Sequence, residues 1–182
     1  MRLGADGWLR GCRRVESPNH DERPGDEQPT LLVIHSISLP PGEYGGDAIE
    51  RLFTNRLEAH AHPYFREIEG LRVSAHFLVR RNGEVVQFVP TSRRAWHAGE
   101  STWRGRARCN DFSVGIELEG GDDAEFEPSQ YRRLAELIAT LRQALPLRDI
   151  AAHSEIAPGR KTDPGTRFDW PRLLAALAHH NI

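Results

Sequence analysis

The sequence has few cysteines, few lysines and no long apolar run. Its two cysteines, Cys12 and Cys109, are too few for a disulfide framework and lack the spacing of a cysteine zinc site. No apolar stretch approaches the ~20 residues that a membrane-spanning helix needs. Residues 1–10 lack the apolar core of a secretory signal. We therefore expect a reduced, cytoplasmic protein.

Charge and composition narrow the class of partner. The chain has 182 residues, a net charge of −2 and 38% hydrophobic residues. This length suits one domain with a substantial core. A charge so close to zero gives no reason to expect nucleic acid or an anionic membrane as a partner. We expect a monomer that binds a small molecule.

Apolar periodicity predicts a single α/β domain with a mixed β-sheet flanked by α-helices. Residues 1–30, rich in proline and charge, are expected to be an extended lead-in to a domain over residues 31–182. Loops are expected over residues 60–71 and 90–110, and the second is long enough to suggest a functional loop. Strands are expected at 31–37, 76–79, 84–89, 112–119 and 150–153, and helices at 47–57, 128–145 and 168–178.

The sharpest local signal is Asn82-Gly83 between two β-rich runs. This pair is typical of a hairpin with a type I′ turn. In the strand over residues 112–119, alternation places Glu117 on the face opposite Val114, Ile116 and Leu118.

Two histidines, His35 and His153, each follow an apolar run, and Asp163 lies between two Pro-Gly pairs in a stiff loop. Histidine and aspartate suit zinc, which takes three protein ligands and an open position when it is catalytic. Each histidine alone is more often a structural residue. Their identical placement favours a zinc site. His76 and His97 compete as ligands, although His97 suits substrate contact better.

A carboxylate within a strand is expensive to bury unless it is paired or ligated. Glu117 is therefore either a solvated residue on an edge strand, as neighbouring Glu119 suggests, or a general base beside the metal. Lys161 is the only lysine among 24 lysines and arginines, so its position favours an ammonium over a guanidinium.

Five segments resemble one family, the amidase/peptidoglycan recognition proteins, and within it the cytosolic 1,6-anhydro-N-acetylmuramoyl-L-alanine amidases of the AmpD type. The resemblance runs from about Gly7 to Leu174 and implies a mixed sheet flanked by helices. The segments that carry it are His35–Gly42, Arg72–His76, Arg94–Gly99, Arg108–Gly120 and Ile156–Gly165.

The resemblance implies a Zn²⁺ cofactor on His35, His153 and Asp163, with Glu117 and Lys161 as catalytic residues. The substrate would be an anhydro-muropeptide, cut between the lactyl group and L-alanine. Two other interpretations stay open: a binding module that does not cleave muropeptides, and an amidase acting on intact cell wall. The resemblance places Ser36, Tyr64, Arg72, Trp96 and Arg108 beside the substrate, with Ser36 standing where relatives commonly carry asparagine.

Overall fold

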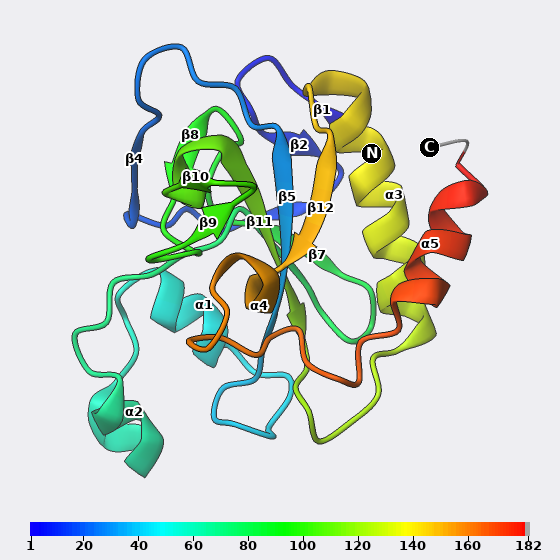
Figure 1. Ribbon diagram of the computed structural model, residues 1–182. Helices are drawn as coiled ribbons and strands as arrows, with labels where there is room; N and C mark the ends of the chain where they lie inside the picture. Colours follow the sequence, from blue (N-terminus) through cyan, green and yellow to red (C-terminus); the bar gives the residue numbers. More distant parts are fainter. Residues whose placement is uncertain (181–182) are drawn as a thin grey trace.

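A six-stranded mixed sheet forms the centre of the protein, as the computed structural model in Figure 1 shows for residues 1–180. Its strand order is β12-β5-β11-β6-β7-β3. Neighbouring strands are parallel except for the antiparallel β6–β7 pair. Helices flank the sheet, so the expected α/β class is confirmed. The central strands are β5 (Leu31–Ile37), β6 (Phe77–Val79), β7 (Val85–Gln87), β11 (Ser113–Glu119), β12 (Asp149–Ala152) and the short β3 (Arg13–Arg14).

Smaller elements surround this sheet. Three two-stranded sheets pair β1 (Arg2–Leu3) with β2 (Leu9–Arg10), β4 (His20–Glu22) with β8 (Arg93–Ala95), and β9 (Thr102–Trp103) with β10 (Arg106–Ala107). The α-helices are α1 (Ala48–Phe53), α2 (Pro63–Glu67), α3 (Pro128–Ala144), α4 (His153–Ile156) and α5 (Trp170–Ala178), and two 3-10 helices span Ala59–Ala61 (η1) and Cys109–Phe112 (η2).

Helices α3 and α5 lie side by side over one face of the sheet (Figure 1). The predicted apolar face of α3 packs there against alternate residues of β5 and β11. Asp169 caps α5 by accepting a hydrogen bond from the Arg172 amide at 2.9 Å. Burial of these side chains is the main stabilising contribution on this face, at about 25 cal/mol for each Å² of apolar surface. The shared cluster includes Leu32, Ile34, Val114, Ile116, Leu118, Leu134, Leu137, Ile138, Leu141, Leu173 and Leu177.

Helices α1 and α2 pack with a second cluster built on β6 and β7. Ile49, Leu52 and Phe53 of α1 contact Leu78 and its neighbours there. Asp47 precedes α1 as predicted, but its carboxylate makes no capping bond and instead accepts from Arg51 Nε at 2.8 Å. Helix α1 ends at Phe53, four residues before the predicted end.

The hairpin between β6 and β7 forms as predicted, but its turn type differs. Gly83 has φ +86°, whereas Asn82 is absent from the residues with positive φ. A type I′ turn needs positive φ at both central residues. The amide of Gly83 donates to the Arg80 carbonyl at 2.8 Å, and the Arg80 amide donates to Glu84. This is a type I turn completed by a left-handed glycine, the three-residue hairpin loop.

Three further boundaries differ from the sequence expectation. The expected loop over residues 60–71 contains most of η1 and all of α2, and the loop over residues 90–110 contains β8, β9 and β10. His153 does not end a strand, because β12 stops at Ala152 and His153 opens α4.

Cys12 and Cys109 are free thiols, in agreement with the absence of a disulfide framework.

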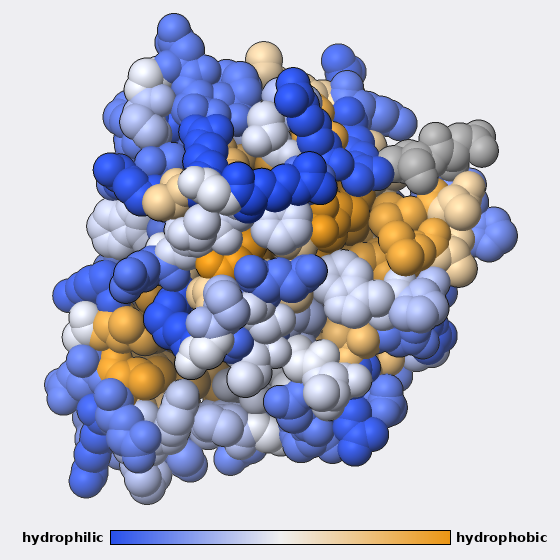
Figure 2. All heavy atoms as spheres, viewed as in Figure 1, coloured by the Kyte–Doolittle hydropathy of each residue, from blue (hydrophilic) through white to orange (hydrophobic). Residues whose placement is uncertain are grey.

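The surface seen in Figure 2 is mostly polar, with apolar side chains gathered over α5 and at the lower left of the view. Among residues 1–180, no helix is both long and apolar enough to cross a membrane.

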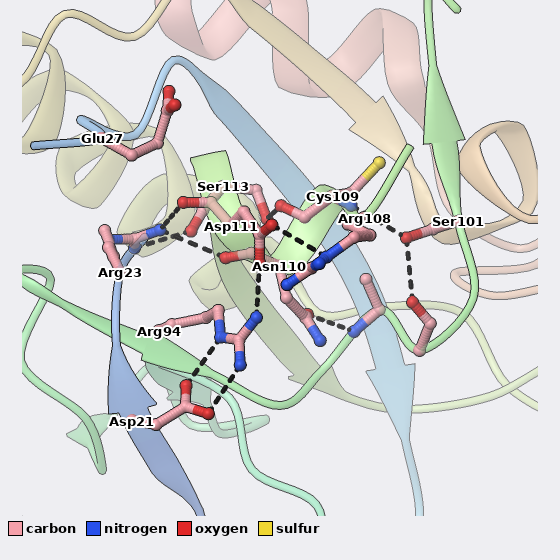
Figure 3. A network of polar contacts seen from close by, with 12 residues as sticks. Asp21, Arg23, Glu27, Arg94, Ser101, Arg108, Cys109, Asn110, Asp111 and Ser113 are labelled. Atoms are coloured by element: carbon pink, nitrogen blue, oxygen red, sulfur yellow. Dashed lines mark hydrogen bonds and ion pairs between the residues drawn. The ribbon is translucent and has the colours of Figure 1, made fainter. Parts of the chain in front are cut away.

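The expected lead-in, residues 1–30, lies against the domain and contributes β3 to the edge of the central sheet. Its strongest attachment is Arg23, which is 7% exposed. The guanidinium donates to the backbone carbonyls of Asn110, Asp111 and Ser113 at 2.8–3.2 Å (Figure 3). It also donates to the carbonyl of Thr91 at 3.2 and 3.3 Å. Burial lowers the pKa of Arg23 to about 10. Arg23 thus joins the N-terminal segment to the start of β11.

We expect Arg23→Met to destabilise the fold by about 3 kcal/mol, because four carbonyls would lose a buried donor. Arg10→Met is a matched control, since Arg10 is exposed on the same segment. This control should change the free energy of unfolding by less than about 0.5 kcal/mol. Urea unfolding followed by circular dichroism measures both. Equal stability of the two variants would contradict this role for Arg23.

Candidate active site

The register of three parallel strands brings three of the predicted residues to one level of the sheet. Glu117 of β11 is the direct partner of His35 on β5. Ala152 of β12 is the partner of Ile34, so His153 follows at the level of His35. Side chains at paired positions point to the same face of a sheet. His35 and Glu117 therefore lie on one face of the sheet, next to the end of β12, where His153 follows.

Asp163 completes a cluster with the two histidines. The Nδ1 atoms of His35 and His153 are 2.9 Å apart, and Asp163 Oδ2 lies 3.1 and 3.0 Å from them. The imidazoles are buried and the carboxylate is one-fifth exposed. These three residues form a group whose ligand atoms could hold one metal ion. The predicted ligand triad is thus brought together from three separate parts of the chain.

The protonation pattern of this cluster fits a cation. Nε2 of His153 lies 3.1 Å from the carbonyl oxygen of Ala98. A carbonyl only accepts, so Nε2 carries the proton and Nδ1 of the neutral ring presents a lone pair. That lone pair faces the Asp163 carboxylate. Two acceptors at this separation repel each other, and a metal ion among the three ligand atoms would remove the repulsion.

Burial and charge shift the acid–base properties of the cluster in the metal-free protein. Burial lowers the pKa of His35 to about 4, which favours the neutral imidazole that a metal requires. Burial alone would raise the pKa of Asp163, but the adjacent side chains of His153 and His35 hold it well below its usual range. The carboxylate therefore stays ionised and is ready to bind a cation.

Glu117 is buried in the wall beside this cluster, and its Oε2 has no hydrogen-bond partner. Burial, with the charge of Asp163, raises the pKa of Glu117 well above its usual value, and the ammonium of Lys161 opposes this shift. The alternative of a solvated edge strand is wrong, because β11 lies between β5 and β6. Neighbouring Glu119 is also buried and accepts from Arg80 at 2.9 Å.

The cluster opens into a cavity of about 360 Å³. Glu117 and Lys161 line it together with the three cluster residues. The side chain of Lys161 is exposed and makes no hydrogen bond or ion pair within residues 1–180, so its ammonium is free to meet a ligand. The opposite wall is apolar and comes from α1, α2 and the adjoining loops. Its side chains are Leu39, Leu52, Phe53, Ile68, Leu71 and Val73.

The five residues that the resemblance places beside the substrate divide into two groups. Ser36, Tyr64 and Trp96 line the cavity. Arg72 is exposed and borders a neighbouring depression that shares Ile68 and Leu71 with the cavity wall. Arg108 is also exposed and pairs with Asp111 at 3.0 Å (Figure 3). The cavity thus contains three of the five, and the two arginines lie outside it.

The competing histidines are not members of the ligand cluster found among residues 1–180. His76 is fully buried, accepts from the Gly115 amide and contacts the Arg93 carbonyl. His97 is 9% exposed, and its Nδ1 is 2.9 Å from Nε2 of His35. Sequence reasoning missed this contact. The available signal was the position of His97 immediately after Trp96, in a loop predicted to be functional.

Comparisons with known proteins give a family and a set of relatives for this chain. The profile of the N-acetylmuramoyl-L-alanine amidase family matches residues 25–166. The 1,6-anhydro-N-acetylmuramyl-L-alanine amidase AmpD of Escherichia coli K12 is 57% identical over 174 residues, which cover 94% of this chain and 95% of the relative.

Solved structures show the same fold. A crystal structure of a selenomethionine derivative of AmpD superposes with a TM-score of 0.94 at 54% identity, covering 97% of this chain and 99% of the other. The amidase AmiD of Escherichia coli, solved with the substrate anhydro-N-acetylmuramic acid-L-Ala-D-γ-Glu-L-Lys, has a TM-score of 0.58 at 28% identity and covers 93% of this chain and 60% of AmiD.

We expect the protein to hold one zinc ion per chain after dialysis against metal-free buffer. His35→Ala and Asp163→Ala should each lose most of it, because each removes one of three ligands. His60→Ala is the control, since His60 is an exposed histidine, and it should keep full occupancy. Elemental analysis of the folded variants measures the metal. Full zinc content in either ligand variant would show that the triad is wrong.

Proposed function

The chain belongs to the N-acetylmuramoyl-L-alanine amidase family, and we propose that it is a zinc-dependent enzyme that cleaves 1,6-anhydro-N-acetylmuramoyl peptides. The bond hydrolysed is the amide between the lactyl group of the sugar and L-alanine. Such an enzyme serves the recycling of peptidoglycan fragments. The products are the free anhydro sugar acid and the stem peptide.

One observation carries an enzymatic function over a purely binding one. Glu117 leaves a carboxylate oxygen without a partner in the wall of the cavity, beside the ligand cluster. An unpaired buried carboxylate costs several kcal/mol of stability unless a charged or hydrogen-bonding ligand meets it. A module that only binds muropeptides has no need of a base at this place. A proton acceptor next to a metal site is what amide hydrolysis requires.

The donor set supports zinc as the metal. Two neutral imidazoles and one carboxylate, with one side open to the cavity, match the three-ligand sites of catalytic zinc. When bound, zinc supplies Lewis-acid polarisation of a carbonyl and acidifies water to a pKa of about 7. His35, His153 and Asp163 would hold the ion. Each of these side chains is anchored by a buried strand, a helix start or a short loop.

The protein's own residues then divide the proton transfer and charge stabilisation between them. Glu117 accepts a proton from the attacking water, and its raised pKa lets it return this proton to the leaving amine of L-alanine. Lys161, which lines the same cavity, stabilises the negative charge that develops on the carbonyl oxygen. Its flexible ammonium suits this task better than a planar guanidinium.

The cavity supports a substrate with a sugar at one end and a peptide at the other. Trp96 and Tyr64 offer aromatic faces for the sugar, and Ser36 offers a hydroxyl. Arg72, in the adjoining depression, is placed to meet a carboxylate of a stem peptide that leaves the cavity on that side. In this proposal Arg108 also binds a carboxylate of the stem peptide, after its ion pair with Asp111 is broken.

We propose further that the protein acts in the cytoplasm as a monomer, with neither nucleic acid nor membrane as a partner. Its two free thiols suit a reducing compartment. An enzyme in this location meets imported wall fragments and not the intact wall.

The purified, zinc-loaded protein should release the intact stem peptide from an anhydro-muropeptide, which mass spectrometry of the products detects. Polymeric peptidoglycan at matched concentration should react at least about tenfold more slowly, a difference in transition-state free energy of about 1.4 kcal/mol. Binding without any product would favour the recognition-module alternative. Equal rates on the two substrates would favour an amidase for intact wall.

Glu117→Gln should lower kcat by roughly 10²–10⁴-fold, because the substitution keeps the shape of the side chain and removes its basic oxygen. Zinc content and muropeptide affinity should stay near wild type, the pattern of an interaction made mainly in the transition state. Glu119→Gln is the matched control on the same strand. It breaks the Arg80 pair and should lower stability while the folded enzyme keeps its kcat.

Single-turnover kinetics and metal analysis on the two variants distinguish the outcomes. Near wild-type turnover in Glu117→Gln would contradict its role as base. Loss of zinc together with activity would instead make Glu117 a ligand.

A further inference from the structure

His97 lies in the loop after β8, and its ring fills a space beside β11 that only a glycine leaves open. A Cβ at Gly115 would lie 2.4 Å from Cγ of His97. Heavy atoms cannot approach so closely, so the glycine makes room for the ring. His97 is buried and sits edge-on to His35, with ring centroids 5.0 Å apart.

A chain of hydrogen bonds runs from a backbone carbonyl to His35, and its direction is fixed. Ser113 Oγ donates its single proton to the Cys109 carbonyl at 2.6 Å. Ser113 Oγ must therefore accept from Nε2 of His97, which is 3.1 Å away. A neutral imidazole with its proton on Nε2 presents a lone pair at Nδ1. His97 Nδ1 accordingly accepts from Nε2 of His35 at 2.9 Å, which leaves Nδ1 of His35 free as a lone pair in the ligand cluster.

Ala98, which follows His97 in the chain, orients the second histidine of the cluster, His153. The carbonyl of Ala98 accepts from Nε2 of His153. The amides of His97 and Ala98 both donate to Oδ1 of Asn110, at 3.2 and 2.8 Å. Two consecutive residues, held by one asparagine side chain, thus present the acceptors that orient both histidine ligands.

We propose that His97 is a positioning residue for metal binding, which fixes the tautomer and the ring orientation of His35 through the Nδ1(His97)···H–Nε2(His35) hydrogen bond. This inference rests on the zinc-dependent function proposed above. Metal-bound histidines generally donate their second ring N–H to an acceptor, and loss of that acceptor typically lowers metal affinity 10–100-fold. Here the acceptor is a neutral imidazole, which is itself ordered by Ser113.

The chain offers a matched pair of substitutions that isolates this contact. Asparagine and leucine have the same branched shape at Cγ, and asparagine Oδ1 occupies the place of histidine Nδ1. His97→Asn keeps an acceptor for His35, whereas His97→Leu removes it. Both variants lose the contact with Ser113 and leave the same space unfilled. Any difference between them therefore reports the hydrogen bond to His35.

The experiment measures the Zn²⁺ dissociation constant of each folded variant by competition with a chromophoric chelator. It also measures the visible spectrum of the Co²⁺-substituted protein and the melting temperature of the metal-free form. We expect His97→Leu to bind zinc 10–100-fold more weakly than wild type and to shift the Co²⁺ absorption bands. His97→Asn should recover zinc affinity to within about threefold of wild type, as expected when the positioning acceptor is kept.

A core truncation far from the site, Leu134→Ala on α3, is the stability control. It should lower the melting temperature without changing the zinc affinity of the folded protein. Equal affinities of the leucine and asparagine variants, whether both strong or both weak, would overturn the inference, because His97 would then be a space-filling residue or a ligand. A wild-type protein that binds no zinc would instead overturn the zinc-dependent function itself.

Gly115→Ala supplies a second route to the same contact without altering His97. The added methyl group displaces the ring, so a soluble, folded Gly115→Ala protein should show the weakened zinc affinity and shifted Co²⁺ spectrum of His97→Leu. Wild-type affinity and spectrum in this variant would count against the inference.

Discussion

The candidate site depends on the register between three parallel strands. The pairing of Glu117 with His35, and of Ala152 with Ile34, sets the proposed base and two of the proposed ligands side by side. Because side chains alternate along a strand, a slip of one residue would turn Glu117 or His35 to the opposite face. The apolar residues on that opposite face pack against α3 and α5. The hydrophobic core therefore fixes the strand register that brings the candidate site residues together. The stability of the site thus depends on that of the whole sheet.

The same face of the sheet carries an unusually polar buried layer. His35, His76, His97, His153 and Glu117 are all less than a tenth exposed. Buried polar groups destabilise a fold unless they find partners. The partners here are other members of this layer, the side chains of Asp163, Ser113 and Arg23, and backbone groups of Arg93, Ala98 and Gly115. Residues 1–30 thus support the site from a distance, and Oε2 of Glu117, which has no hydrogen-bond partner among residues 1–180, lies in the wall of the cavity.

How far the sequence predicted this protein can be seen at particular residues. Strand β5 was predicted from a continuous apolar run, β11 from the alternation of its apolar residues and α3 from its amphipathic spacing, and the two histidines stood out because each follows an apolar run. The predicted type of the turn at Asn82 was wrong, since Arg80 and Glu84 close a wider loop around a left-handed Gly83. The elements within residues 60–71 and 90–110 were missed, as their strands and helices are two to five residues long and lack a period. The contact between His97 and His35 joins positions 62 residues apart, and the position of His97 after Trp96 indicated a functional loop without identifying its partner.

Hydrogen bonds join the two loops that complete the site. Arg160 donates to the carbonyls of Ala98 and Glu100 at 2.6 and 2.5 Å, and so links the loop that carries Lys161 and Asp163 to the loop that orients His35 and His153. The Ser154 amide donates to the Asp163 carbonyl at 3.0 Å, which ties that loop back to the start of α4. A displacement of either loop would therefore change both the geometry of the three candidate ligands and the position of the Lys161 ammonium. The apolar wall formed by α1 and α2 shares none of these bonds, so its side chains can vary in shape without disturbing the metal ligands. The proposed metal ligands and the apolar wall proposed to meet substrate are therefore separate parts of one cavity.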